Sequence, residues 1–332
     1  MDAERQLLED IEQEERGFLR LELGQGASLV VSASGGRVFG PFMDGNDPLG
    51  WCPDRPEFAR MLREHQWNIG GERVWLAPEG LFNFTDPNHV IETYRVDPSL
   101  DPGSWRLERR GAGCLLSLDA DVALASGTGS IGVRISRTIE PFATNAAVGA
   151  RAVAGYRQRV EVRQTGGETL PLVPWIIRQV APGGMAFASA SDGGTTTAIF
   201  GDPPRSALKA RDGHWQVDMS GPGFYKVACH RDAIGRGDMG YLKAFGANTA
   251  FAVLCQPVLA VASAYPETLP LDRAATGQAA ALFYDSGRFG AYGELELYGH
   301  RTPAGRGVLE TDCLLLRGAA AELRQRIGLA DD

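Results

Sequence analysis

The sequence predicts an all-β protein, a large antiparallel β-sandwich with short peripheral helices, and three observations support this prediction. Segments with β-branched or aromatic residues at alternating positions recur along the chain, each bounded by Gly, Pro, Asn or Asp. These segments do not alternate regularly with helices, so the strands are expected to pair antiparallel in sheets that pack face to face. Glycine makes up 42 of the 332 residues, well above the average share of about 7%, which indicates many tight turns.

Helices are expected only at the edges of this sandwich. Residues 3–16 and 319–329 combine helix-forming residues with a stripe of apolar side chains. Residues 57–67 carry a third, shorter stripe, in which Phe58 and Leu62 lie at helical spacing. All three segments are amphipathic, so each is expected to cover an outer face of the sheets.

One β-sandwich domain is therefore expected over residues 17–317, after an N-terminal helix in 1–16 and before a C-terminal helix and tail in 318–332. No internal repeat, low-complexity linker or block of charge divides it. The clearest predicted strands are residues 18–23, 27–32, 37–42, 105–109, 114–118, 133–140, 155–163, 170–180 and 251–257.

Charge and composition exclude several classes of partner. The formal net charge of −8 repels polyanions, so nucleic acid is not an expected partner. The first residues are charged and do not resemble a secretory signal, and no apolar run approaches the roughly 18 residues of a membrane span. We expect a cytoplasmic protein without membrane contact. The five cysteines are odd in number and lack CxxC spacing, so neither disulfides nor a zinc site is expected, and the cysteines are interpreted as small core side chains.

Residues 127–132, GTGSIG, match the GxGxxG pattern of dinucleotide-binding turns. Phosphate binding requires the glycine turn to open a helix, because the helix N-terminus faces the pyrophosphate. Here Val133 and Ile135 alternate with polar residues, which is the period of a strand. A hairpin turn is the favoured interpretation, and no nucleotide or redox cofactor is expected.

Residues 67–80, WNIGGERVWLAPEG, form the densest cluster of residues suited to ligand binding. On a strand, Arg73 and Trp75 share one face, and Glu79 follows shortly after them. An indole can pack against the C–H face of a sugar while a guanidinium donates hydrogen bonds to its hydroxyls. An ordinary core tryptophan beside a surface ion pair is the alternative.

Two further strands carry charge in apolar surroundings. In residues 172–180, Trp175 and Arg178 fall on opposite faces, and Arg178 lies either at a sheet end or in a functional site. In residues 292–300, Glu294 and Glu296 share one face, so both are solvated or held by cations. If they face a pocket, the two carboxyls can divide acid and base roles between them.

Three other side chains are candidates, each with a purely structural alternative. Lys226 is a lone cation in an aromatic strand, while His65 and His300 lie near the two clusters that contain Trp67 and the late glutamates. No HxH or HExxH spacing occurs, so no metal is expected from the histidines. Residues 44–47, DGND, could ligate calcium through oxygens, but a turn explains them equally well.

In this order along the chain, these pieces resemble the galactose mutarotase-like (aldose 1-epimerase-like) superfamily, in particular its uncharacterised bacterial branch. The resemblance covers roughly residues 17–317. Its specific motif is GGERVWLAPEG, and the other segments support it by their order: residues 35–40, 46–51, the Pro174-Trp175 strand with 182–184, and 293–299.

The resemblance implies a β-supersandwich whose concave face binds a sugar. In characterised mutarotases a late-strand Glu takes the proton of the anomeric hydroxyl and a His protonates the ring oxygen, so Glu294 or Glu296 is the implied base. This sequence departs from the pattern, because Glu72-Arg73 follows the glycine pair where mutarotases carry a His. His65 and His300 are the remaining candidates for the acid.

We therefore expect a sugar 1-epimerase that acts on a small, possibly acidic sugar without a cofactor or metal. The predicted sugar-binding and catalytic residues are Arg73, Trp75, Glu79, Trp175, Arg178, Lys226, Glu294, Glu296, His65 and His300. Cleavage of a glycosidic bond in the same pocket, by hydrolysis or elimination, is one alternative. A noncatalytic sugar-binding module is another, and the oligomeric state is open.

Overall fold

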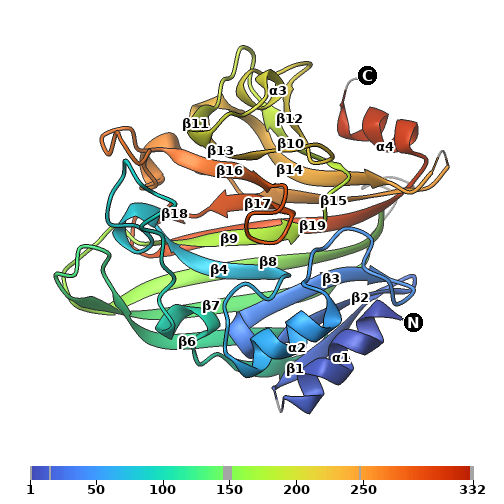
Figure 1. The fold of residues 1–332 in the computed structure, drawn as a ribbon, viewed down its shortest axis with the longest axis horizontal. Coiled ribbons are helices and arrows are strands. Elements are labelled where there is room, and N and C mark those ends of the chain that lie inside the picture. The colour runs from blue at the N-terminus through green and yellow to red at the C-terminus, as the bar shows by residue number, and fades with distance from the viewer. Residues whose placement is uncertain (1, 15, 145–151, 247, 330–332) are drawn as a thin grey trace.

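The computed structural model describes residues 2–14, 16–144, 152–246 and 248–329. Within these residues, two large antiparallel sheets pack face to face (Figure 1). The predicted all-β sandwich with short peripheral helices is therefore confirmed. None of the helices in the described ranges combines the length and the apolar character needed to cross a membrane.

The first sheet, sheet A, contains nine strands. Across the sheet they follow the order β1 (Phe18–Gly24), β2 (Ala27–Ser32), β3 (Arg37–Met43), β4 (Glu72–Ala77), β9 (Val173–Val180), β17 (Tyr292–Tyr298), β16 (Gln278–Asp285), β13 (Phe224–His230) and β11 (Thr197–Gly201). The central strands β4, β9 and β17 come from three distant parts of the sequence, which the sheet places side by side.

The second sheet, sheet B, packs against one face of sheet A. Its strands follow the order β12 (His214–Asp218), β10 (Met185–Ala190), β14 (Ile234–Ala244), β15 (Ala250–Pro257), β19 (Gly307–Gly318), β8 (Ala152–Gly166), β7 (Ser130–Phe142), β6 (Gly113–Ala123) and β5 (Arg106–Arg110), and β18 (His300–Arg301) pairs with β19. Several of these strands are longer than the alternation predicted, because polar residues on their solvent face continue the pairing.

The α-helices lie on the outside, as expected (Figure 1). They are α1 (Ala3–Gln13), α2 (Arg55–Arg63), α3 (Arg205–Leu208) and α4 (Ala320–Ile327). Apolar side chains of α1 and α2 pack on β2 and β3, and those of α4 pack on β15 and β19. Helix α2 ends four residues before the predicted end, since Glu64 caps it and His65 adopts a positive φ of 55°.

Short turns of other helical types complete the backbone: Ser34–Gly36, Glu79–Leu81, Ser99–Gly103, Arg231–Ala233 and Ala262–Ala264. The GxGxxG segment is a hairpin turn, as predicted. Leu124 N–H donates to the carbonyl of Gly129, after which β7 pairs antiparallel with β6. No helix follows the glycines, so the segment cannot present a helix N-terminus to a phosphate.

The core lies between the two sheets and carries most of the buried apolar side chains. On β4, Val74 and Leu76 belong to it, and Glu72 reaches across to Arg137 of sheet B. Because side chains alternate along a strand, Arg73 and Trp75 point to the opposite face of sheet A. Four of the five cysteines are buried as expected, whereas Cys52 is exposed.

Candidate functional site

A cavity of about 170 Å³ lies on the face of sheet A that points away from sheet B. Its polar lining consists of two cations and three carboxyl groups, Arg73, Lys226, Glu79, Glu294 and Glu296. All five side chains are at least nine-tenths buried. Burying so many charges is favourable only when they are paired, and the pairs below account for them.

Strand register brings these residues together. Arg73 of β4 lies opposite Ile177 of β9, which in turn lies opposite Glu296 of β17. Lys226 reaches the same area from β13, separated from β17 by the single strand β16. Residues separated by more than 200 positions in the sequence thus share one face of one sheet.

The first ion pair joins Arg73 to Glu294. Arg73 Nη2 lies 2.7 Å from Glu294 Oε1, and Gln179 Nε2 donates to the same oxygen at 3.1 Å. The guanidinium carbon of Arg73 lies 4.4 Å from the ring centre of Trp75. Arg73 Nε and Nη1 have no hydrogen-bond partner among the described residues, so these two donors remain for a ligand.

The second ion pair is a branched one centred on Lys226. Lys226 Nζ lies 2.9 Å from Glu296 Oε2 and 3.0 Å from Glu79 Oε2. Tyr298 donates its hydroxyl to Glu296 Oε2 at 3.2 Å, and Tyr94 donates to Glu79 Oε1 at 3.1 Å. Glu296 Oε1 is buried without a partner among the described residues.

Glu296 is poised to exchange a proton near neutral pH. Its pKa is raised to about 7, chiefly by burial and also by the charges of Glu294 and Glu79, against an opposing effect of Lys226. The carboxylic acid form therefore predominates below pH 7 and the carboxylate above it. A group with a pKa near the working pH is suited to general acid–base catalysis.

Aromatic rings enclose these polar groups. Three indoles and two phenols form the floor: Trp67, Trp75, Tyr94, Trp175 and Tyr292. Apolar side chains close one side: Ile91, Phe200, Phe283 and Phe289. The flat indole faces among them are suited to packing against the C–H faces of sugar rings.

Loop residues outside the cavity hold its lining in place. Asp101 accepts a 2.8 Å hydrogen bond from Trp75 Nε1 and pairs at 2.8 Å with the fully buried Arg37. Arg37 also donates to the backbone oxygen of Trp67. The orientation of the Trp75 indole and the position of the Trp67 backbone thus depend on a buried Arg–Asp pair that the sequence pattern did not indicate.

Glu267 stabilises the turn that begins at Glu79. Its Oε2 accepts a 2.8 Å hydrogen bond from the backbone N–H of Glu79. The pKa of Glu267 is raised to about 8, chiefly by burial and also by the charge of Glu79. Glu267 lies in an irregular segment with no periodic pattern, so no sequence signal pointed to it.

Comparison with known proteins supports the assignment of the fold. No protein-family model and no curated protein matches the sequence. The structure is similar to an aldose 1-epimerase candidate from Escherichia coli K12, with a TM-score of 0.50 at 13% sequence identity over 90% of this chain and 99% of that one. It is also similar to a galactose mutarotase-like protein from Lactobacillus casei ATCC 334, with a TM-score of 0.51 at 9% identity over 91% of this chain and 100% of that one. The chain has the galactose mutarotase-like fold.

In this mutarotase-like fold, the cavity collects seven of the ten residues that sequence reasoning selected: Arg73, Trp75, Glu79, Trp175, Lys226, Glu294 and Glu296. The two alternating pairs, Arg73 with Trp75 and Glu294 with Glu296, face the cavity together. The other three predicted residues lie elsewhere.

The prediction for Arg178 as a sugar-binding residue is wrong. Arg178 faces sheet B, where it pairs with Glu72 at 2.5 Å and donates to the hydroxyl of Tyr156 and the carbonyl of Gly40. Arg137 of β7 pairs with the same Glu72. The physical reason is alternation: Trp175 faces the cavity, so Arg178, three positions later, faces the core.

The two histidines proposed as general acid also lie outside the cavity lining. His65 is exposed beyond the end of α2, where its ring contacts Arg16 Nη2 at 3.0 Å. His300 lies on β18, with its ring centre 5.8 Å from that of Tyr265. Neither imidazole therefore lines the cavity.

The DGND segment is a turn. Asp47 Oδ1 accepts hydrogen bonds from the backbone N–H groups of Leu49 and Gly50, at 3.1 and 2.6 Å. Within the described ranges, no three His, Cys, Asp or Glu side chains are grouped so that they could hold a metal ion.

Proposed function

We propose that this protein is a sugar 1-epimerase that interconverts the anomers of an aldose by acid–base ring opening. One observation carries the proposal: Glu294 and Glu296, each paired with a different cation, meet in one aromatic-lined cavity. The mutarotase-like fold of the chain supports it, since the similar Escherichia coli protein is described as an aldose 1-epimerase candidate.

In the proposed mechanism Glu294 is the base. Its carboxylate takes the proton of the anomeric hydroxyl, while Arg73 orients the carboxylate through their 2.7 Å contact. Glu296, in its acid form, gives a proton to the ring oxygen. The C1–O5 bond breaks as the C1 carbonyl forms, so one proton is taken up, one is released and no redox change occurs.

Ring closure after rotation of the aldehyde reverses both proton transfers and yields the other anomer. The unpaired donors Arg73 Nη1 and Trp175 Nε1 are proposed to bind hydroxyl oxygens of the sugar. Lys226 keeps Glu296 and Glu79 in position through its paired contacts at 2.9 and 3.0 Å.

Proton NMR exchange spectroscopy tests this function. Anomer interconversion of freshly dissolved aldoses of the gluco, galacto, manno and xylo series is followed with and without protein. Four series are used because the cavity lining does not identify the configuration of the sugar. We expect faster anomeric exchange with at least one sugar. Glu294→Gln should lower the catalysed rate by about 10²- to 10⁴-fold, the usual contribution of a general base.

Glu310→Gln is the matched control. Glu310 lies on β19 of sheet B and pairs with Arg159 at 3.1 Å, outside the cavity lining. It should leave the rate unchanged. Sugar line broadening without faster exchange would instead indicate a noncatalytic binding module, and full activity in Glu294→Gln would exclude Glu294 as the base.

A further inference from the structure

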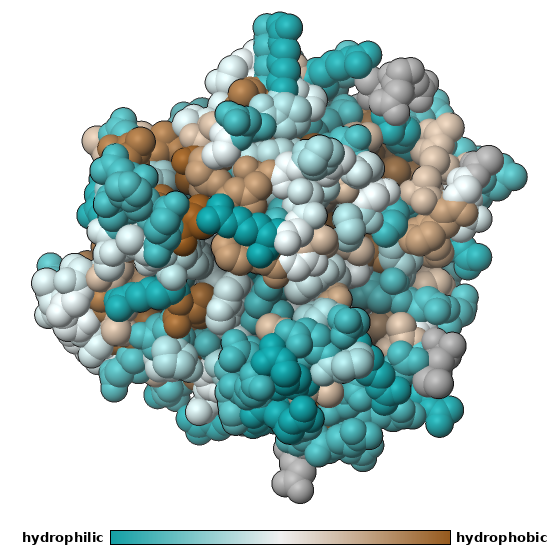
Figure 2. Space-filling view, viewed as in Figure 1, coloured by the Kyte–Doolittle hydropathy of each residue, from teal (hydrophilic) through white to brown (hydrophobic). Residues whose placement is uncertain are grey.

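One side of the cavity is a cluster of four rings in tilted and edge-to-face contact, Phe200, Phe224, Phe283 and Phe289, which we call the phenylalanine wall. The ring centres of Phe200 and Phe224 lie 5.3 Å apart, and those of Phe283 and Phe289 lie 5.8 and 5.9 Å from Phe224. Phe200, Phe283 and Phe289 line the cavity. Figure 2 shows hydrophobic residues gathered on this face over β11, β13 and β16.

The wall extends to the mouth of the cavity, where Phe289 is held in place by polar contacts. Phe289 is 45% exposed and lies in the loop between β16 and β17. Asp285, which is 1% exposed, accepts hydrogen bonds from the backbone N–H groups of Gly287 and Arg288 at 2.8 and 2.6 Å. Asn68 donates to the carbonyl of Phe289 at 3.2 Å. An exposed aromatic side chain is thus presented on an anchored loop.

A bare monosaccharide does not match this wall. Sugar rings carry hydroxyls around their whole edge, and an unpaired hydroxyl buried against apolar groups costs free energy. The phenylalanine wall offers no polar side-chain atom, whereas the donors and acceptors lie on the floor around Arg73, Lys226 and Glu294. The part of a ligand that faces the wall must therefore be apolar.

The charges of the cavity argue against an acidic substituent. Arg73 is already paired with Glu294, and Lys226 is already paired with Glu79 and Glu296. An anionic group inside the cavity would meet three carboxyl groups, and both cations of the lining already have a carboxylate partner. Arg288, which packs on Phe224 and Phe289, does not line the cavity. An uncharged ligand avoids this repulsion.

We infer that the cavity takes an uncharged sugar that carries a flat apolar substituent. The sugar ring lies on the polar floor, and the substituent packs against the phenylalanine wall. This inference rests on the sugar site of the proposed function and is independent of the epimerase chemistry.

Matched methyl and phenyl glycosides of the gluco, galacto, manno and xylo series test the inference by isothermal titration calorimetry. Glycosides have no free anomeric hydroxyl, so the assay measures binding alone. We expect the phenyl glycoside of at least one series to bind about tenfold more tightly than its methyl partner, as expected for one added aromatic contact with its buried area.

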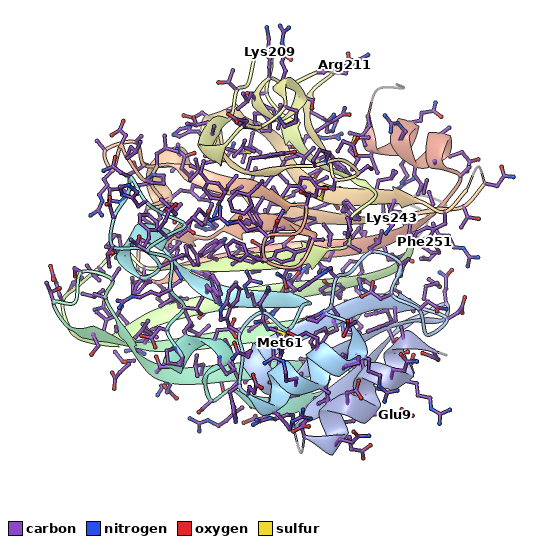
Figure 3. The ribbon with its side chains drawn as sticks, viewed as in Figure 1. Glu9, Met61, Lys209, Arg211, Lys243 and Phe251 are labelled. Atoms are coloured by element: carbon purple, nitrogen blue, oxygen red, sulfur yellow. The ribbon has the colours of Figure 1, made fainter. Side chains whose placement is uncertain are left out.

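Two variants and one control test whether the higher affinity for the phenyl glycoside arises at the phenylalanine wall. Phe200→Ala and Phe289→Ala should each reduce the ratio of phenyl-glycoside to methyl-glycoside affinity to about threefold or less. Phe245→Ala is the control, because Phe245 is 50% exposed and packs against Phe251 and Lys243 in another hairpin. Figure 3 shows Lys243 and Phe251 at the right-hand end of the sheets.

Equal affinity for methyl and phenyl glycosides would overturn the apolar subsite while leaving the sugar site intact. A phenyl preference that persists in both Phe200→Ala and Phe289→Ala would also overturn it. If neither member of any pair binds, the sugar site itself is contradicted, and the proposed function fails together with this inference.

Discussion

The raised pKa of Glu296 predicts a specific pH dependence of stability. Its carboxyl is fully buried, and its pKa rises from 4.5 to about 7 on folding, chiefly through burial. The native state therefore holds a proton that the unfolded state releases between these values. Because the folded pKa is raised, Glu296 destabilises the fold as pH increases from about 4.5 through 7.

The magnitude follows from the shift. Each pKa unit corresponds to about 1.36 kcal/mol, so a change from 4.5 to about 7 corresponds to about 3 kcal/mol of unfolding free energy lost by pH 8. Glu296→Gln removes the titrating group, so the variant should lose this part of the pH dependence. Its absolute stability is not the test, because the substitution also removes a partner of Lys226.

Urea unfolding of the wild type and Glu296→Gln at pH 5, 6, 7 and 8 measures the effect. Glu310→Gln, on the surface of sheet B, is the control and should keep the wild-type slope. If the unfolding free energies of wild type and Glu296→Gln run parallel across this range, Glu296 does not carry the proton, and its role as the acid loses its basis.

Two further predictions concern residues behind the cavity. Arg178→Met should lower the unfolding free energy by about 3 kcal/mol, because it removes a buried partner of Glu72, yet leave sugar affinity unchanged. Chemical denaturation and calorimetric titration check this, and a loss of affinity at unchanged stability would return Arg178 to the site. Glu267→Gln should reduce the fall in stability between about pH 5 and 8, since folding raises the pKa of Glu267 from 4.5 to about 8. Urea unfolding at these pH values measures the effect. If the unfolding free energy of the variant changes with pH as steeply as that of the wild type, the expectation is contradicted.

The sequence could predict the sandwich and much of the site because both depend on the alternation of side chains between the two faces of a strand. Alternation placed Arg73 with Trp75 and Glu294 with Glu296 on shared faces, and sheet pairing brings the two faces together. The same alternation separates Trp175 from Arg178, so the two could not both face a cavity on β9. Arg178 faces the core, where it shares the carboxylate of Glu72 with Arg137 of a distant strand. The pattern of β9 alone does not contain that information.

Two further residues that support the site lie outside the strands, where sequence patterns are weakest. Asp101 and Glu267 act through single hydrogen bonds to Trp75 and to the backbone of Glu79. Neither belongs to a periodic segment, so only tertiary structure brings them to the cavity. The histidines were selected because they lie close in sequence to site residues, but this closeness does not determine where a side chain points. His65 lies past the end of α2, where it is exposed to solvent.

The most direct test of the central claim is the rate of anomeric exchange measured by proton NMR from pH 5.5 to 8.5. With Glu294 as base and Glu296 as acid, protein should accelerate exchange, the acceleration should decline above about pH 7 as Glu296 loses its proton, and Glu294→Gln should abolish it. No acceleration with any aldose, at any pH in this range, would contradict the assignment of this cavity as an epimerase site.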